Sequence, residues 1–331
     1  MDENFPILER LSLKCPFSAD SENRLPLTLP NGFLAPNLLH LTLYDIGLPK
    51  RLQVLTSTVS LVKLELRDIQ TCYIRPRLLV ARLRSLPLLE ELIIEFSIHI
   101  HRPSTERDLL GEEGAPITFP SLKNFEFAGV GTYLESFVAQ IRTPFLKRLE
   151  ITLFNQIPCA LPHLFDLINI ANVFKLSSAP VIFTYGQVQV FTRHGLERSP
   201  FSLCVRCKPL NWQLDCATQI CHGLIPTLSG AEKLTLAFIS SGYHDIRTEL
   251  QDRAIDSAMW RDLLRSFIGM KVLHIFGKLS EELSRALQAD EVGSDPGFLP
   301  NLQSIQASHN LFTSFIDTRE VAGHPVQFVQ E

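Results

Sequence analysis

The thiols in the second half of the chain are the residues best suited to chemistry, because thiolates and imidazoles are the usual ligands of tetrahedral zinc. Four cysteines and one histidine lie close together there: Cys204, Cys207, Cys216, Cys221 and His222. However, zinc knuckles place two cysteines on a tight turn, whereas residues 202–206 alternate as a strand does, which sends Cys204 and Cys207 to opposite faces. Cysteine is also a common buried apolar filler. We therefore expect no metal, and a zinc-stabilised structural protein using these four cysteines is the alternative interpretation.

Other motifs of catalysis are not evident in the sequence. It contains no glycine-rich phosphate loop, no G-x-S-x-G nucleophile elbow and no H-E-x-x-H zinc motif. No nucleophile and base stand close enough in sequence to suggest a catalytic pair. We therefore predict that the chain is not an enzyme and needs no cofactor.

Composition and charge narrow the class of partner. The 331 residues carry 31 Lys and Arg against 35 Asp and Glu, a net charge of -4, so no basic footprint for nucleic acid or an anionic membrane is expected. The start of the chain lacks the features of a secretory signal, and no apolar run approaches the ~20 residues that span a bilayer. The sequence predicts a monomeric cytoplasmic or nuclear protein with reduced thiols.

The elements that position these residues follow from one recurring six-residue frame, L-x-x-L-x-L. Its copies start about 29 residues apart on average, a spacing typical of repeat architectures. The clear and looser copies begin at Leu8, Leu38, Leu61, Leu89, Leu122, Leu146, Ala231, Met270 and Leu302, with degenerate ones near Val173 and Pro200. The last three residues of the frame alternate apolar, polar, apolar, as a half-buried strand requires.

Segments with helical spacing lie between the frames. They are expected near residues 51–58, 76–86, 133–141, 161–174, 211–225, 246–267 and 280–289. A unit of this size cannot bury its own apolar face, so neighbours must stack. The sequence predicts an α/β fold, an irregular leucine-rich-repeat solenoid with an arc of mostly parallel strands on one face and helices on the other. We expect a single domain over residues 1–331 with about eleven units, least regular at 177–210, where extra strand pairing is expected, and with a loop insertion at 101–116.

The outward positions of the strands offer a candidate binding surface. In each frame the residues beside the apolar positions point away from the core and form rows across neighbouring strands. A mixed-charge set on this face forms the predicted partner-binding site: Lys63, Glu65, Arg67, Glu91, Glu95, Glu126, Arg148 and Glu150. The sequence leaves two interpretations open, an ordinary solvated sheet face with weak cross-strand pairs and a surface that binds a protein partner.

Several long segments of the chain have a familiar pattern: FVAQIRTPFLKRLEITLFNQ followed by LPHLFDLIN, then LNWQLDCATQICHGLIPTLSGAEKLTLAF, WRDLLRSFIGMKVLHI and LPNLQSI. Together they resemble the leucine-rich C-terminal region of F-box proteins from mushroom-forming fungi. The similarity covers roughly residues 1–310 and lies in packing segments typical of that family rather than in catalytic motifs. The resemblance implies the substrate-recognition part of a ubiquitin-ligase receptor, in which an F-box holds Skp1 and the repeats hold a protein substrate.

The F-box of that family is not found ahead of the first frame, which already begins near Phe5. We therefore expect that this chain by itself does not bind Skp1, and that it is a fragment of a longer F-box protein or a shortened relative. The function predicted from the sequence is a protein–protein interaction module with an unknown protein substrate. The alternatives are the zinc-stabilised structural protein and a truncated relative without ligase function.

Overall fold

The fold is described from a computed structural model of the chain. The described residues are 4–15, 28–30, 32–46, 53–69, 74–97, 116–154, 160–171, 178–192, 199–239, 256–277, 279–288 and 298–330. They divide into two compact units, residues 1–152 and 153–331, and each is described by itself.

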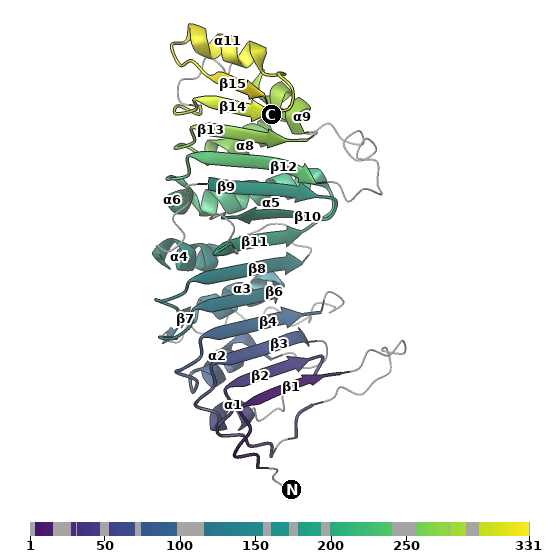
Figure 1. The fold of residues 1–331 in the computed structure, drawn as a ribbon, viewed down its shortest axis with the longest axis vertical. Coiled ribbons are helices and arrows are strands. Elements are labelled where there is room, and N and C mark those ends of the chain that lie inside the picture. Colours follow the sequence, from purple (N-terminus) through teal and green to yellow (C-terminus); the bar gives the residue numbers. More distant parts are fainter. Residues whose placement is uncertain are drawn as a thin grey trace. The chain divides into compact units, whose positions relative to one another are not determined.

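Unit 1 is built on a sheet whose strands lie side by side in chain order (Figure 1). Its strands are β1 (Arg10–Lys14), β2 (His40–Tyr44), β3 (Lys63–Ile69), β4 (Glu91–Phe96), β6 (Asn124–Gly129) and β8 (Arg148–Phe154), of which the last runs just past the unit's end. Neighbouring pairs from β1 to β6 are parallel. The helices α1 (Gln53–Ser57), α2 (Pro76–Leu83) and α3 (Gly131–Val138) connect them, and β5 (Ile117–Thr118) pairs with β7 (Ile141–Arg142) in a small second sheet.

The same hydrogen bonds recur where each strand begins. The carbonyl of Leu39 accepts from the N–H groups of Val62 and Lys63, and the carbonyl of Val62 accepts in the same way from Glu90 and Glu91. Equivalent pairs of hydrogen bonds are accepted by the carbonyls of Glu9, Glu90 and Lys123 in unit 1, and by those of Glu232 and Lys271 in unit 2. Because these carbonyls occupy one position of the six-residue frame, the frame recurs in backbone geometry as well as in sequence.

The apolar positions of the frame form the core. Leu64, Leu92 and Leu149 are fully buried or nearly so, and so are their counterparts in the other described frames from Leu38 onward. Their outward neighbours are half-buried, which gives the alternation expected of a sheet with one covered face. The first copy is the exception among the copies that the structure describes, because its apolar residues Leu11 and Leu13 stay half-exposed on β1, which forms the edge of unit 1.

Unit 2 has strands and helices of the same kinds (Figure 1). Its strands follow the order β11 (Phe201–Arg206), β10 (Gln187–Phe191), β9 (Ser178–Thr184), β12 (Lys233–Ile239), β13 (Val272–Phe276), β14 (Ser304–Ala307) and β15 (Gln327–Gln330). The helices are α4 (Pro162–Ala171), α5 (Leu210–Gly223), α6 (Ile225–Leu228), α8 (Ser257–Arg265), α9 (Leu279–Leu287) and α11 (Thr313–Val321).

Strand β10 runs against both of its neighbours. It pairs antiparallel with β9 and with β11, whereas β9 pairs parallel with β12. The connection from β9 to β10 is only Tyr185 and Gly186, too short for the crossover that a parallel pair needs. The extra strand pairing predicted for residues 177–210 is thus confirmed, and it is antiparallel.

The predicted α/β class with mostly parallel strands is confirmed, as is a helix in each predicted segment, although the bounds differ by several residues. The loop expected at 101–116 lies outside the described residues except for Pro116. Within the described part of the chain, no helix has the length and apolar character needed to cross a bilayer.

Candidate functional site

All eight residues of the predicted binding set lie at outward strand positions of unit 1, and we call them the ionic strand face. The register aligns Lys63, Glu91 and Asn124 in one row and Glu65, Ile93 and Glu126 in the next. These positions alternate with the buried frame residues along each strand. The side chains of the ionic strand face are therefore available to contacts outside the core.

Lys63 stands between two carboxylates. Its Nζ lies 2.7 Å from Oε1 of Glu65 on the same strand and 3.1 Å from Oε2 of Glu91 on β4. Glu65 also accepts a hydrogen bond from Nε of Arg67 at 3.1 Å, and its side chain is only 14% exposed. The carboxylate of Glu65 is thus held between two cations of its own strand.

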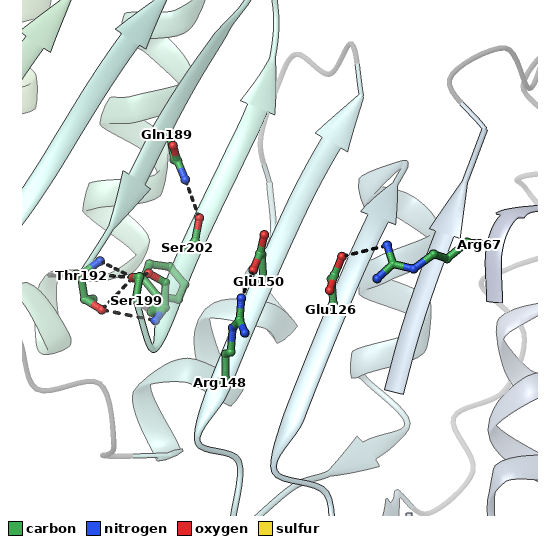
Figure 2. A network of polar contacts seen from close by, with 9 residues as sticks. Arg67, Glu126, Arg148, Glu150, Gln189, Thr192, Ser199 and Ser202 are labelled. Carbon is green, nitrogen blue, oxygen red and sulfur yellow. Dashed lines mark hydrogen bonds and ion pairs between the residues drawn. The ribbon is translucent and has the colours of Figure 1, made fainter. Parts of the chain in front are cut away.

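Arg67 joins three strands. Its Nη1 donates to Oε2 of Glu95 on β4 at 2.8 Å and to Oε1 of Glu126 on β6 at 3.4 Å. Figure 2 shows the dashed contact between Arg67 and Glu126. Because β4 lies between β3 and β6, the guanidinium reaches across it. The paired register of β3 and β4 is interrupted between Leu66 and Ile69, where Arg67 stands.

Arg148 and Glu150 form the remaining pair, on β8. Nη2 of Arg148 donates to Oε2 of Glu150 at 2.7 Å, as Figure 2 shows. The two residues are two positions apart on one strand and so share a face. The other described residues offer no hydrogen-bond acceptor to the buried Nε of Arg148.

The backbone places Glu150 opposite Glu126. The N–H of Asn124 donates to the carbonyl of Glu90 at 3.0 Å, and Asn124 is aligned with the next residue, Glu91. The N–H of Arg148 makes the equivalent bond, to the carbonyl of Lys123 at 2.9 Å. By the same geometry Arg148 is aligned with Asn124, and Glu150 with Glu126 two residues later. Like charges directly opposite on adjacent strands are destabilising.

The electrostatics of the face divide its glutamates into two kinds. Burial alone would raise the pKa of Glu65, but the hydrogen bonds from Lys63 and Arg67 outweigh it and lower that pKa. The bond with Glu65 in turn raises the pKa of Lys63, and bonds with Glu65 and Glu95 raise that of Arg67 against the effect of burial. These three residues stabilise one another in their charged forms.

Glu126 behaves in the opposite way. Burial raises its pKa, the charge of Arg67 lowers it, and the nearby carboxylates of Glu150 and Glu95 raise it again, so that the net shift is upward. The contact between Nη1 of Arg67 and Oε1 of Glu126, at 3.4 Å, does not offset the effects of burial and of the two carboxylates. Negative charge at this end of the ionic strand face is therefore incompletely compensated.

Sequence reasoning missed two side-chain pairs beside this surface. Nζ of Lys123 lies 2.6 Å from Oε1 of Glu90, and Nδ2 of Asn124 donates to Oε1 of Glu91 at 3.3 Å. Lys123 and Glu90 occupy the frame position just before the first row. Aligning that position across frames would have brought them together.

The outward face of unit 2 differs because it is mostly uncharged. Nε2 of Gln189 on β10 donates to Oγ of Ser202 on β11 at 2.8 Å, as Figure 2 shows. Nζ of Lys233 reaches Oε1 of Gln306 at 3.4 Å. Amides and hydroxyls thus take the place that ion pairs hold in unit 1.

The four cysteines of the zinc alternative are all buried. A hydrogen bond with Cys216, together with burial, raises the pKa of Cys207, and burial raises the pKa of Cys221. Zinc binds thiolates, which these surroundings disfavour. Among the described residues, no three histidine, cysteine, aspartate or glutamate side chains are grouped so that they could hold a metal ion. The geometry therefore does not favour zinc.

Comparison of the chain with protein-family models and with curated proteins finds no significant match.

Proposed function

We propose that the chain is a protein-interaction module, built as an irregular leucine-rich-repeat array, whose ionic strand face binds a protein partner. The array is supported by the recurrence of the frame with the same buried positions and the same hydrogen bonds at the start of each strand. In such arrays the strand surface is the extended face on which large partners bind.

One observation carries the choice of surface. All eight residues of the ionic strand face lie in ion pairs with one another, on four strands of one unit. Ion pairs hold long side chains in defined positions, which lowers the entropy lost when a partner binds them. A preorganised charged surface favours specific recognition of a partner with complementary charge.

The resemblance of the packing segments to fungal F-box proteins suggests what the partner is for. In that setting the bound protein would be a substrate presented to a ubiquitin ligase, and this chain would be the substrate-recognition part of the receptor. The partner's identity is left to experiment, and Skp1 is not proposed as a ligand of this chain.

The proposal is tested by site-specific photo-cross-linking. A benzophenone amino acid replaces Ala128, which points outward beside Glu95 in the register, and the matched control replaces the exposed Asp262 on α8. In extract from the source cells, the benzophenone at position 128 should cross-link a discrete protein, and the benzophenone at position 262 should not cross-link it. Mass spectrometry identifies that protein, and calorimetry with the purified pair measures its affinity. Identical products at both positions, or none at the face, would contradict the proposal.

A further inference from the structure

The turns that lead into the strands of unit 1 lie along one edge of its sheet, because the strands run parallel (Figure 1). These turns are closed by a recurring hydrogen bond: the N–H of Leu89 donates to the carbonyl of Leu86, and that of Leu146 to the carbonyl of Thr143. We call the four turns before β3, β4, β6 and β8 the amino-terminal rim, and they comprise residues 58–61, 86–89, 119–122 and 143–146. All four lie within the described part of the chain.

The tips of these turns carry side chains that folding does not require. The third position of the turn is Ser60 or Ser121 in two of them, but Leu88 and Phe145 in the other two. Small polar residues are the usual choice in turns, where they face water. Leu88 is nevertheless 52% exposed and Phe145 62% exposed. Because serine serves the same position twice, packing within the chain does not account for these two large apolar side chains.

The surroundings of the two apolar tips are basic. One carboxylate, that of Glu90, lies beside the rim, and its Oε1 is 2.6 Å from Nζ of Lys123. Arg84, Arg142 and Lys147 are exposed, and no carboxylate of the described residues pairs with them. Arg142 and Lys147 flank the tip at 145, and Arg84 precedes the tip at 88 by four residues. The charge of the rim is therefore complementary to an acidic partner.

The spacing of the two tips favours a helix. Strands β4, β6 and β8 are adjacent, so Leu88 and Phe145 are two strand gaps apart, about 10 Å at about 4.8 Å per gap. Residues seven positions apart share one face of a helix and are separated by about 10.5 Å. Residues on one face of an extended segment are separated by about 7 or about 13 Å. Between the tips, the small Ser121 leaves room for a side chain of the helix.

We propose that the amino-terminal rim of unit 1 binds an acidic amphipathic helix of a partner protein. Apolar residues of the helix contact Leu88 and Phe145, and its carboxylates pair with Arg84, Arg142 and Lys147. An apolar centre surrounded by charged residues is the usual arrangement of a protein–protein interface. The rim contains none of the residues of the ionic strand face, so this is a second binding surface and does not depend on the function proposed above.

The test uses three synthetic peptides of equal length. EEALAEELAELAEEA has its leucines on one helix face, EEALALEALEEAEEA has the same composition with the leucines spread round the helix, and QQALAQQLAQLAQQA keeps the leucine face without carboxylates. Calorimetry with the whole chain should show that the first peptide binds at least about tenfold more tightly than either of the others. Raising the salt concentration should weaken its binding, because part of the contact is ionic.

Substitutions of the two tips locate the binding site. Leu88→Ser with Phe145→Ser introduces the residue that the other two turns already carry, so the fold should be retained in circular dichroism. This variant should bind the first peptide at least about tenfold more weakly. The matched control, Ile170→Ser with Val321→Ser, removes two exposed apolar side chains from helices of unit 2 and should bind normally.

Substitutions of the cations test the ionic part of the contact. Arg142→Gln with Lys147→Gln should weaken the binding of the first peptide and reduce its dependence on salt. The matched control is Arg75→Gln with Arg77→Gln, which removes two exposed arginines at the start of α2 and should leave the affinity unchanged.

Equal affinity of the two acidic peptides, binding of none of the three, or undiminished affinity in the serine variant would overturn the proposal. Sedimentation with vesicles of phosphatidylcholine and phosphatidylserine, and analytical ultracentrifugation of the chain alone, test two other occupants of the rim. Vesicle binding or dimerisation that the serine variant abolishes would also overturn it. The cross-linking at Ala128 decides the function of the ionic strand face separately.

Discussion

At the scale of single residues, the two central glutamates of the ionic strand face show how one surface holds carboxylates of opposite character. Glu65 lies between two cations of its own strand, whereas Glu126 shares one distant guanidinium and faces another carboxylate. The side chain of Glu65 is 14% exposed and that of Glu126 is 35% exposed, yet burial raises the pKa of each, so the arrangement of neighbouring charges decides the direction of the net shift.

The pH dependence of stability should reflect this difference. The lowered pKa of Glu65 contributes stability that is present above the ordinary value of 4.5 and is lost as the pH falls through the folded value. The raised pKa of Glu126 acts in reverse, because stability falls as the pH rises from 4.5 through its folded value. At neutral pH, Glu126→Gln should therefore raise Tm, whereas Glu65→Gln should lower it. Carboxyl NMR titration checks the cause, and a Glu126 midpoint at or below 4.5 would contradict it.

Arg67 should be the most sensitive single residue of the face. Arg67→Met keeps most of the aliphatic stem but removes three ion pairs, so we expect a loss of about 1–2 kcal/mol in the free energy of unfolding. Denaturant unfolding measures it, and a double-mutant cycle with Glu95→Gln isolates the 2.8 Å pair. Arg265→Met, which removes one exposed pair on α8, is the control and should cost less. Equal losses would argue against a network.

At the scale of elements, the six-residue frame accounts for most of what could be predicted. Its alternation indicated strands, and the fixed spacing of apolar positions set which side chains share a row, so the ionic strand face could be identified from sequence. The direction of β10 could not be predicted from its alternation, because a pattern of period two is the same for a parallel and an antiparallel strand. Its antiparallel pairing follows from the short connection at Tyr185 and Gly186.

The contacts within the face could not be predicted in the same way. Which carboxylate Arg67 reaches depends on the rotamer of a long side chain and on the interrupted register after Leu66. The opposition of Glu126 and Glu150 could be found by aligning frames, but the raised pKa of Glu126 also needs the burial that only the folded structure supplies.

The frame makes a prediction about stability at this scale. Leu92→Ala removes a buried side chain between β4 and the helices and should cost about 2–5 kcal/mol. Leu11→Ala changes the same frame position on the half-exposed β1 and should cost much less. Chemical denaturation of the two variants gives the comparison. Similar losses in the free energy of unfolding would show that the contribution of this frame position does not increase from the edge strand to the central strands.

A buried arginine holds the C-terminal elements of unit 2. Arg319 on α11 is 1% exposed, and its guanidinium donates to the carbonyls of Phe298 and Leu299 at 3.1 Å each. Burial lowers its pKa. Arg319→Ala should leave both carbonyls unpaired and lower the free energy of unfolding by about 2–4 kcal/mol. Hydrogen exchange at α11 and β15 checks that the loss is local, and unchanged protection there would contradict this role. The exposed Glu320→Ala is the neighbouring control.

At the scale of the whole molecule, the small net charge of -4 conceals how the charge is distributed. Unit 1 displays paired charges of both signs on its strands, while the strands of unit 2 display mainly amides, hydroxyls and apolar side chains. Charge patterning of this kind gives specificity and fast association more than raw affinity. The affinity and the association rate of the partner are therefore expected to depend on ionic strength and on the sign of each charge that it contacts.

The central claim, that the ionic strand face binds a protein, is tested most directly by the affinity of the cross-linked partner for a neutralised face. A charge-reversing Lys63→Glu substitution would place a third carboxylate beside Glu65 and Glu91 and destabilise the fold by repulsion. The variant therefore carries the neutral substitutions Lys63→Gln, Glu126→Gln and Arg148→Gln. Calorimetry should show at least about tenfold weaker binding, with the folded state retained in circular dichroism. Arg265→Gln with Asp262→Asn and Lys271→Gln is the matched control and should bind normally. Undiminished affinity in the neutralised variant would contradict the account.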